Sequence, residues 1–198
     1  MKIVHCFGAR LKMNNKDSGT IKMYDPHEKF QRENTTALIQ WANRIFNIKG
    51  NFVDIGCADG WAINYLQDNY DCKGTGVSAD SSDIDECYKH KVVCSLGLAS
   101  KTMHKDESMD FIYCRQTLEH CDDPLGAIRE LKRILKPGGH MIISVPEFCL
   151  KYFSCETHKF VMPMKCWLRL FELAELKILH NIELIGFESE YCMVVKKE

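Results

Sequence analysis

The sequence predicts an α/β protein, in which a mostly parallel sheet is covered by helices on both faces. Short apolar segments of strand length alternate along the chain with amphipathic segments of helix length, a pattern typical of parallel sheets. The strand expected at residues 52–55 leads into a helix through the glycine-containing turn 56–60. The continuous apolar run 141–145 suits a strand that is buried on both faces.

The expected helices are identified by capping residues and by apolar side chains at helical spacing. Thr35 or Thr36 can cap the first helix, and Ser82 can cap a later one. Pro124 suits the first turn of another helix, which the Pro and Gly residues at 137–139 end. The expected helices are 35–46, 60–68, 82–89, 124–135 and 164–176.

The expected strands are short apolar runs bounded by turn residues. They are 52–55, 73–77, 91–96, 110–114 and 141–145, followed by two closing strands near 182–185 and 191–195. Gly186 separates the two closing strands. We therefore expect them to pair like a hairpin at one edge of the sheet.

The composition argues against several classes of function. Lys and Arg total 26 while Asp and Glu total 27, for a net charge of −1, so charge does not suggest a nucleic-acid or membrane partner. No window reaches the roughly 18 apolar residues of a membrane span, and residues 1–7 do not resemble a signal peptide. The 11 cysteines include no C-x-x-C pair, so free thiols and a cytoplasmic location are expected.

The most informative motif is Val53-Asp54-Ile55-Gly56-Cys57-Ala58-Asp59-Gly60. A glycine turn between a strand and a helix exposes bare backbone and aims the first N–H groups of the helix at a ligand. The carboxylate of Asp54 repels phosphate and suits a ligand with ammonium and hydroxyl donors. That profile fits S-adenosylmethionine better than the pyrophosphate of a dinucleotide.

Two blocks of sequence resemble the class I S-adenosylmethionine-dependent methyltransferases, and within them the small type 11 group. The first block is the glycine turn, and the second comprises 109–112, Leu118-Glu119-His120, 131–139 and 142–146. The resemblance covers residues 35–147 well. It implies a Rossmann-like three-layer sandwich with a mostly parallel seven-stranded sheet and an antiparallel last strand. The cofactor would lie over the carboxyl ends of the strands, where open α/β sheets bind ligands.

The resemblance also implies which residues hold the cofactor. Those for the methionine half are Asp54, Gly56, Cys57, Ala58 and Gly60. The end of the second strand, with Ser78 and Asp80, would meet the ribose hydroxyls. The end of the third, with Ser95 and Leu96, would face the adenine, and Gln116 would line the sulfonium end.

Two positions depart from the family pattern. The family usually has Asp or Glu where Ser78 stands, which leaves Asp80 as the nearest carboxylate for the ribose. It often has Asp where Ser95 stands. A hydrogen bond to a neutral hydroxyl is weaker than one to a carboxylate, so we expect either weaker cofactor binding or a compensating role for Asp80.

The candidate catalytic residues are Glu119 and His120, which follow the fourth strand where the sheet opens on the cofactor. Histidine titrates near neutrality, so His120 is the candidate general base. In similar quinone-pathway O-methyltransferases the Glu-His pair lies near the substrate and is implicated in binding a divalent metal. The alternative is that both residues only shape the loop.

Other polar residues carry weaker expectations. No metal ligand is assigned, because Cys149, Cys155 and His158 lack the paired spacing of structural zinc sites. His158 is either a substrate contact or a loop histidine. Tyr24 and His27 could form a lid, although a solvated extension is preferred. One basic cluster is expected to be a solvated helix face: Arg129, Lys132, Arg133 and Lys136.

We expect one domain, 1–198. Residues 1–33 form an irregular arm, 34–147 the cofactor-binding core, and 148–198 a substrate-side insertion with the closing strands. The expected function is methyl transfer from S-adenosylmethionine to a small-molecule or saccharide acceptor, at oxygen, since the motifs of many amino-group and cytosine methylases are absent. The alternatives are a methyltransferase fold that binds without turnover and a dinucleotide-dependent oxidoreductase, whose G-x-G-x-x-G spacing is missing. The sequence does not predict an oligomeric state.

Overall fold

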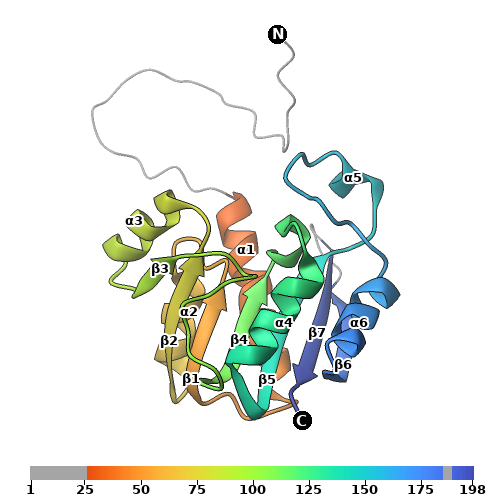
Figure 1. The fold of residues 1–198 in the computed structure, drawn as a ribbon. Coiled ribbons are helices and arrows are strands. Elements are labelled where there is room, and N and C mark those ends of the chain that lie inside the picture. The colour runs from red at the N-terminus through yellow and green to blue at the C-terminus, as the bar shows by residue number, and fades with distance from the viewer. Residues whose placement is uncertain (1–25, 185–188) are drawn as a thin grey trace, which may run out of the picture.

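The computed structural model describes residues 26–184 and 189–198, and a seven-stranded sheet forms its middle layer (Figure 1). The strand order is β3-β2-β1-β4-β5-β7-β6. The strands are β1 (Gly50–Ile55), β2 (Cys72–Ser78), β3 (Cys94–Leu96), β4 (Met109–Arg115), β5 (Leu135–Pro146), β6 (Lys177–Leu184) and β7 (Glu190–Lys196). The first five are parallel to one another, while β7 runs antiparallel to both β5 and β6. The predicted sheet is thereby confirmed.

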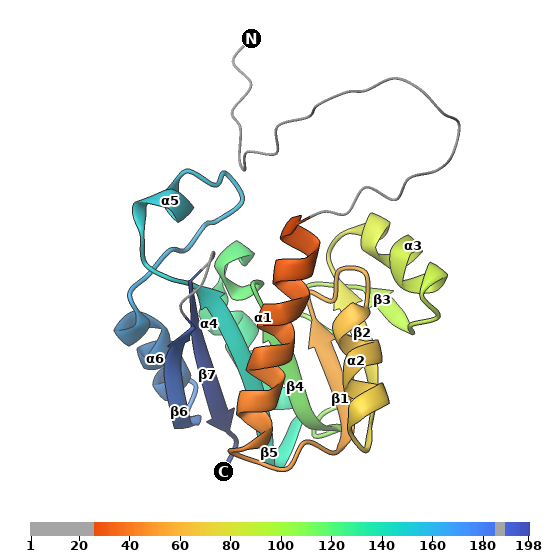
Figure 2. The same cartoon turned by 180° about the vertical axis from the view of Figure 1, so that it is seen from behind.

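Helices cover both faces of the sheet. They are α1 (Pro26–Asn43), α2 (Trp61–Asn69), α3 (Ser81–Lys89), α4 (Pro124–Ile134), α5 (Leu150–Phe153) and α6 (Met164–Leu173), with a 3-10 turn η1 (Leu118–His120). Helices α1 and α2 lie on the face shown in Figure 2, and α4 and α6 lie on the other. Each face has its own apolar core, one around Trp167 and Phe171 of α6 and one around Leu38 and Ile39 of α1.

Helix α1 is the largest departure from the expected elements. The arm was expected to remain irregular to residue 33, but the helix begins at Pro26. Proline suits a first helical turn because its missing N–H needs no partner there. The start of α1 is polar, with the segment Glu33-Asn34-Thr35-Thr36 inside the helix, so apolar spacing alone does not reveal it.

Other details of the elements also differ from the expectation. Helix α3 is capped by Asp80, whose carboxylate accepts from the Ser82 N–H, rather than by Ser82 itself. Helix α4 ends at Ile134, and β5 begins at once with Leu135. The closing strands pair as expected, but β7 inserts between β5 and β6, so that only β6 occupies the edge.

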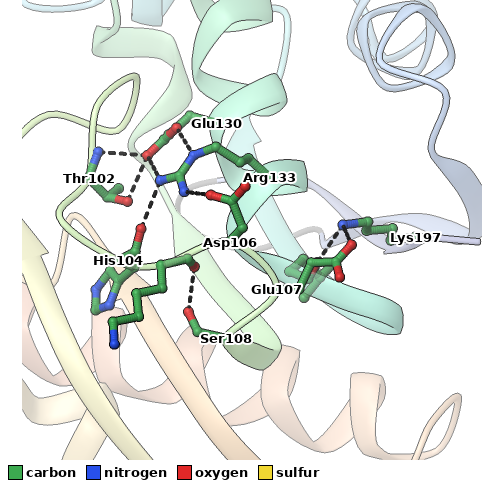
Figure 3. A network of polar contacts seen from close by, with 10 residues as sticks. Thr102, His104, Asp106, Glu107, Ser108, Glu130, Arg133 and Lys197 are labelled. Atoms are coloured by element: carbon green, nitrogen blue, oxygen red, sulfur yellow. Dashed lines mark hydrogen bonds and ion pairs between the residues drawn. The ribbon is translucent and has the colours of Figure 1, made fainter.

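The basic face of α4 is not simply solvated. Arg133 donates to Glu130 on its own helix and pairs with Asp106 in the loop before β4 (Figure 3). Glu130 also accepts from the N–H and hydroxyl of Thr102, each at 2.8 Å. These bonds lower the pKa of Glu130 to about 2, with the Arg133 contact as the largest cause. This network of hydrogen bonds and ion pairs connects the loop between β3 and β4 to helix α4.

Candidate active site

The turn after β1 has the backbone conformation that a ligand-binding loop requires. Gly56 and Gly60 have φ angles of 80° and 77°, and between them Ala58 has a φ of 45°. The Gly56 N–H donates to the Val77 carbonyl of β2 at 2.8 Å. Positive φ is strained for alanine, and such strain often occurs at binding sites. The turn is therefore held rigidly at the carboxyl edge of the sheet.

A cavity of about 380 Å³ lies beside this turn. Its lining combines the β1 turn, the start of α2, the inner side of α1 and the end of β4: Gln31, Arg32, Thr35, Asp54, Gly56, Cys57, Ala58, Asp59, Trp61, Ala62, Tyr113, Arg115 and Gln116. Five expected cofactor residues are in this lining, namely Asp54, Gly56, Cys57, Ala58 and Gln116. The others lie outside it: Gly60, Ser78, Asp80, Ser95 and Leu96. Gly60, which precedes α2, instead lies against the side chain of Val92.

Asp54 is the buried acid of the cavity, with a residue exposure of 2%. Burial, and then the neighbouring charge of Asp59, raise the pKa of the Asp54 carboxyl to about 8, although Arg115 opposes the shift. A cationic ligand in the cavity would favour the charged carboxylate and reverse this rise. The cavity thus contains a buried carboxyl at the position where a methionine ammonium is expected.

We expect cofactor affinity to depend on pH through Asp54. Below about pH 8 the carboxyl must lose a proton when a cationic ligand binds, so affinity for S-adenosylhomocysteine should rise with pH, by up to about tenfold per unit. Titration calorimetry in buffers of different ionisation enthalpy should show proton release near pH 7. Asp54→Asn should bind at least about tenfold more weakly and release none, unlike the control Asp68→Asn on the exposed face of α2. Unchanged proton release in Asp54→Asn would contradict this assignment.

A buried ion pair forms the wall of the cavity beside β4. Arg115, at the end of β4, pairs with Glu190 at the start of β7, whose side chain is 1% exposed. Glu190 also accepts from Asn34 of α1 at 3.0 Å and from the Ser144 hydroxyl. Each charge is thus fully paired, as burial requires. Sequence reasoning missed both residues, although each is a lone charge next to an apolar strand.

Helix α1 supplies the outer wall of the cavity. Arg32 lies 3.7 Å from the Asp59 carboxylate and stacks over the Trp61 ring, 5.4 Å from its centroid. The Thr35 hydroxyl accepts from the phenol of Tyr113 at 3.4 Å. Arg32 was missed because residues 1–33 were expected to form an irregular arm.

The lid candidates cannot be placed in the same way. Tyr24 lies outside the described residues. His27 belongs to the first turn of α1, but its side chain is also outside the described part.

The ends of β2 and β3 hold the candidates for ribose and adenine. The Ser78 hydroxyl donates to Asp83 of α3 at 2.5 Å and accepts from the Asp80 N–H. Asp80 is exposed and caps α3, and the hydrogen bonds from Ser82 lower its pKa. Ser95 and Leu96 are exposed at the end of the short β3. Asp83 is therefore a second carboxylate at this edge, which sequence reasoning did not identify.

We predict that Asp80 contributes more to cofactor affinity than Ser78. Asp80→Asn keeps a capping side chain but loses the charge, and it should weaken S-adenosylhomocysteine binding about five- to tenfold, the difference between charged and neutral hydrogen bonds. Ser78→Ala should weaken it less, because the hydroxyl is already committed to Asp83. Titration calorimetry measures both, with Asp83→Asn as the third variant. A larger loss in Asp83→Asn would assign the ribose to Asp83 instead.

Glu119 and His120 lie in η1, directly after the cavity residues of β4. The Glu119 side chain is completely buried, and within the described part of the chain neither carboxylate oxygen has a hydrogen-bond partner. Burial raises the pKa of Glu119 to about 8. His120 lies 3.8 Å from Glu119, between Nε2 and Oε1, and its Nδ1 is 2.8 Å from the Thr157 carbonyl. His158 is beside it, with ring centroids 4.9 Å apart.

The structure thus groups His158 with the catalytic candidates. Glu119, His120 and His158 are the one set of three or more potential metal ligands that the described residues bring within 4.8 Å of one another. Cys149 and Cys155 do not join it. The segment that follows β5 therefore meets η1 at this cluster.

A mostly parallel sheet with this strand order and an acidic glycine turn at its carboxyl edge is the fold of a class I methyltransferase. Residues 29–181 match the family described as methyltransferase domain, and the chain belongs to that family. The methyl donor that the family implies is S-adenosylmethionine.

The relatives differ in their acceptors. The chain is 28% identical over 103 residues to phosphoethanolamine N-methyltransferase 3 of Arabidopsis thaliana, a match covering 49% of this chain and 21% of that protein. It is 26% identical over 113 residues to ubiquinone biosynthesis O-methyltransferase of Aliivibrio fischeri, covering 54% of this chain and 47% of that protein. The matches thus span half or less of these curated relatives.

Solved structures share the fold. One chain comes from a complex of a methyltransferase activator with a proposed methyltransferase of Haloferax volcanii. It superposes with a TM-score of 0.74 at 16% identity, over 87% of this chain and 94% of that chain. Among the described residues no helix is both long and apolar enough to cross a membrane.

Proposed function

We propose that the protein transfers a methyl group from S-adenosylmethionine to a hydroxyl of a small-molecule or saccharide acceptor. The observation that carries the proposal is the arrangement at the carboxyl edge of the sheet. The Asp54 cavity is suited to an ammonium group, and the Glu119–His120 pair follows at the same edge. Only Thr117 and Leu118 separate this pair from Gln116 of the cavity lining. One element, β4 with its following turn, connects the two.

The residues present fit the methionine half of S-adenosylmethionine. The Asp54 carboxylate suits an ammonium group, and the exposed backbone of Gly56 and Ala58 leaves room for close approach. Arg115 lines the same cavity, but its guanidinium is already paired with Glu190. When bound, the cofactor supplies an electrophilic methyl group on a sulfonium sulfur.

The chain's own contribution is to align the acceptor and to manage its proton. Alignment of two reacting groups can supply about 7–11 kcal/mol of rate enhancement. The Nδ1 of His120 is oriented by the Thr157 carbonyl, which leaves Nε2 available to take a proton from an acceptor hydroxyl. Glu119 Oε1 lies 3.8 Å from this Nε2.

The preference for oxygen rests on this pair, because an amine acceptor can lose its proton without a positioned base. The similar proteins are named for both chemistries, one as an N-methyltransferase and one as an O-methyltransferase. The second candidate function is binding without turnover, which the neutral Ser78 and the exposed Ser95 favour by removing two acidic cofactor contacts.

The experiment first measures binding of S-adenosylhomocysteine by titration calorimetry. Purified protein is then incubated with S-adenosylmethionine and panels of phenols, sugars, hydroxy acids and amines, and release of S-adenosylhomocysteine is measured. Turnover with hydroxyl compounds alone supports the proposal. Turnover with amines alone rejects the oxygen assignment. Binding without turnover favours the second function, and absence of binding rejects both.

A further inference from the structure

We propose that a cavity at the amino edge of the sheet binds a free α-amino acid with an aromatic side chain. The cavity has a volume of about 520 Å³, which is within the range of small-molecule sites. It lies where β1, β4 and β5 begin, and Figure 2 shows α1 ending at this same edge. None of its lining residues belongs to the Asp54 cavity.

The length of the sheet separates this cavity from the candidate active site. Strand β1 begins at Gly50, which lines the cavity, and ends at Ile55, next to Gly56 of the Asp54 cavity. At about 3.3 Å per residue, Gly50 and Ile55 are about 17 Å apart. A ligand at the amino edge therefore cannot receive a methyl group held at the carboxyl edge. The inference is a binding site for an effector and does not rest on the proposed function.

One end of the cavity offers a cation and an anion that no other described side chain neutralises. Lys49 and Asp71 both line the cavity and are exposed. Within the described part of the chain, neither side chain forms a hydrogen bond or an ion pair. Their backbones are adjacent, because the N–H of Gly50, which follows Lys49, donates to the Asp71 carbonyl at 2.9 Å. The carboxylate and the ammonium of an α-amino acid can therefore contact the two side chains together.

The charges in the middle of the cavity are already neutralised. Lys136 pairs with Oδ1 of Asp110 at 2.7 Å, and the Asn51 N–H donates to Oδ2 of the same carboxylate at 2.7 Å. Both oxygens of Asp110 are thus occupied, and Lys136 adds no net charge. The lining as a whole is balanced in charge, which suits a zwitterion better than a simple anion or a simple cation.

The other end of the cavity is aromatic. The ring of His140 on β5 stacks on Phe46, with centroids 4.2 Å apart and planes 3° apart, and both rings line the cavity beside Pro137. Burial, and then the charge of Lys196, lower the pKa of His140, so its ring is uncharged at neutral pH. A further aromatic ring can pack against such rings in an offset or edge-to-face arrangement.

The separation of the two ends determines the shape of the ligand. Strand β4 lies between β1 and β5, so the charged and aromatic ends are two strand spacings apart, or about 10 Å. The ligand must be elongated, with both ionic groups at one end and a ring at the other. Phenylalanine and tyrosine have this form, whereas an aliphatic amino acid or an aromatic acid satisfies only part of the site.

The test titrates the full-length chain with L-phenylalanine and follows the backbone amides by two-dimensional NMR. Binding should saturate at millimolar concentration or below, with the largest shifts at residues 46–50, 71 and 137–140. Three analogues each lack one recognised group: 3-phenylpropionate the ammonium, phenethylamine the carboxylate and L-alanine the ring. Each should bind about two- to tenfold more weakly, as expected for losing one exposed charge pair or one aromatic contact.

Variants of the lining test the assignment of each group. Lys49→Glu and Asp71→Lys place a like charge against one ionic group of the ligand, and each should weaken binding at least about tenfold. His140→Ala should weaken it about two- to tenfold. The matched controls are Lys165→Glu on α6 and Asp85→Lys on α3, which are exposed and outside the cavity lining. Both should bind L-phenylalanine like the unaltered protein.

An amino acid could also enter the Asp54 cavity, and this possibility is tested directly. Binding of L-phenylalanine should survive both saturating S-adenosylhomocysteine and the substitution Asp54→Asn. Loss of binding in either experiment would place the ligand at the carboxyl edge and overturn the proposal. Unchanged affinity in folded Lys49→Glu and Asp71→Lys, equal binding of the three analogues, or no binding at millimolar L-phenylalanine would overturn it as well. Circular dichroism checks that each variant is folded.

Discussion

Replacing Gly56 with alanine should abolish cofactor binding and also destabilise the fold. Gly56 has a φ of 80°, and a Cβ there would lie 2.1 Å from the Thr117 hydroxyl oxygen. That hydroxyl is engaged with the carbonyls of Ile55 and Arg115, each at 3.0 Å, so it cannot move away cheaply. The expected loss in free energy of unfolding is about 2–5 kcal/mol, from a left-handed alanine plus overpacking.

The sequence indicated only that the glycine turn leaves bare backbone for a ligand to approach. The structure adds a second reason, because the nearest obstacle to a side chain at Gly56 is Thr117, on the turn after β4. Gly56 is bare so that two turns of the cavity can touch.

Gly138→Ala is the matched control for this prediction. Gly138 has a φ of 78°, but nothing lies within 4 Å of an added Cβ. Both variants therefore carry the same left-handed strain, and the difference in their denaturant unfolding free energies reports the collision with Thr117. Equal stabilities, together with unchanged S-adenosylhomocysteine affinity in Gly56→Ala, would show that the turn tolerates a side chain.

The second large effect is expected at His120. His120→Ala should lower kcat by about 10²–10⁴-fold with a hydroxyl acceptor, the range for losing a positioned general base. Affinity for S-adenosylhomocysteine should change little, because His120 is not part of the cavity lining. Steady-state kinetics and calorimetry on the same preparation separate the two quantities.

His90→Ala tests whether the loss is specific to His120. His90 is exposed, and its Nδ1 contacts the carbonyl of Asp59 in the glycine turn, at 2.9 Å. Its removal should affect cofactor affinity rather than kcat. If the acceptor is known and kcat is unchanged in His120→Ala, His120 has no role in the mechanism. Catalysis would then come from alignment of the acceptor with the methyl group of the cofactor.

Much of the fold could be predicted from the sequence because the relevant signals are local. Alternation of apolar strands and amphipathic helices defines a parallel sheet, and the acidic glycine turn marks where its ligand binds. The prediction was wrong for the first turns of α1, because their polar residues lack the apolar spacing that identifies a helix. It also misassigned the cap of α3, because Asp80 and Ser82 are both good capping residues and only the backbone decides between them.

The sequence by itself determined the sheet, the edge at which the site lies and the Asp54 turn, since each depends on neighbouring residues. Only the tertiary structure decided the rest of the site. Arg115 and Glu190 are 75 positions apart and Asn34 and Glu190 are 156 apart, while His120 meets Thr157 across 37 positions. No local pattern pairs such residues, because their contacts form only after helix, strand and loop segments far apart in the sequence have folded around one sheet.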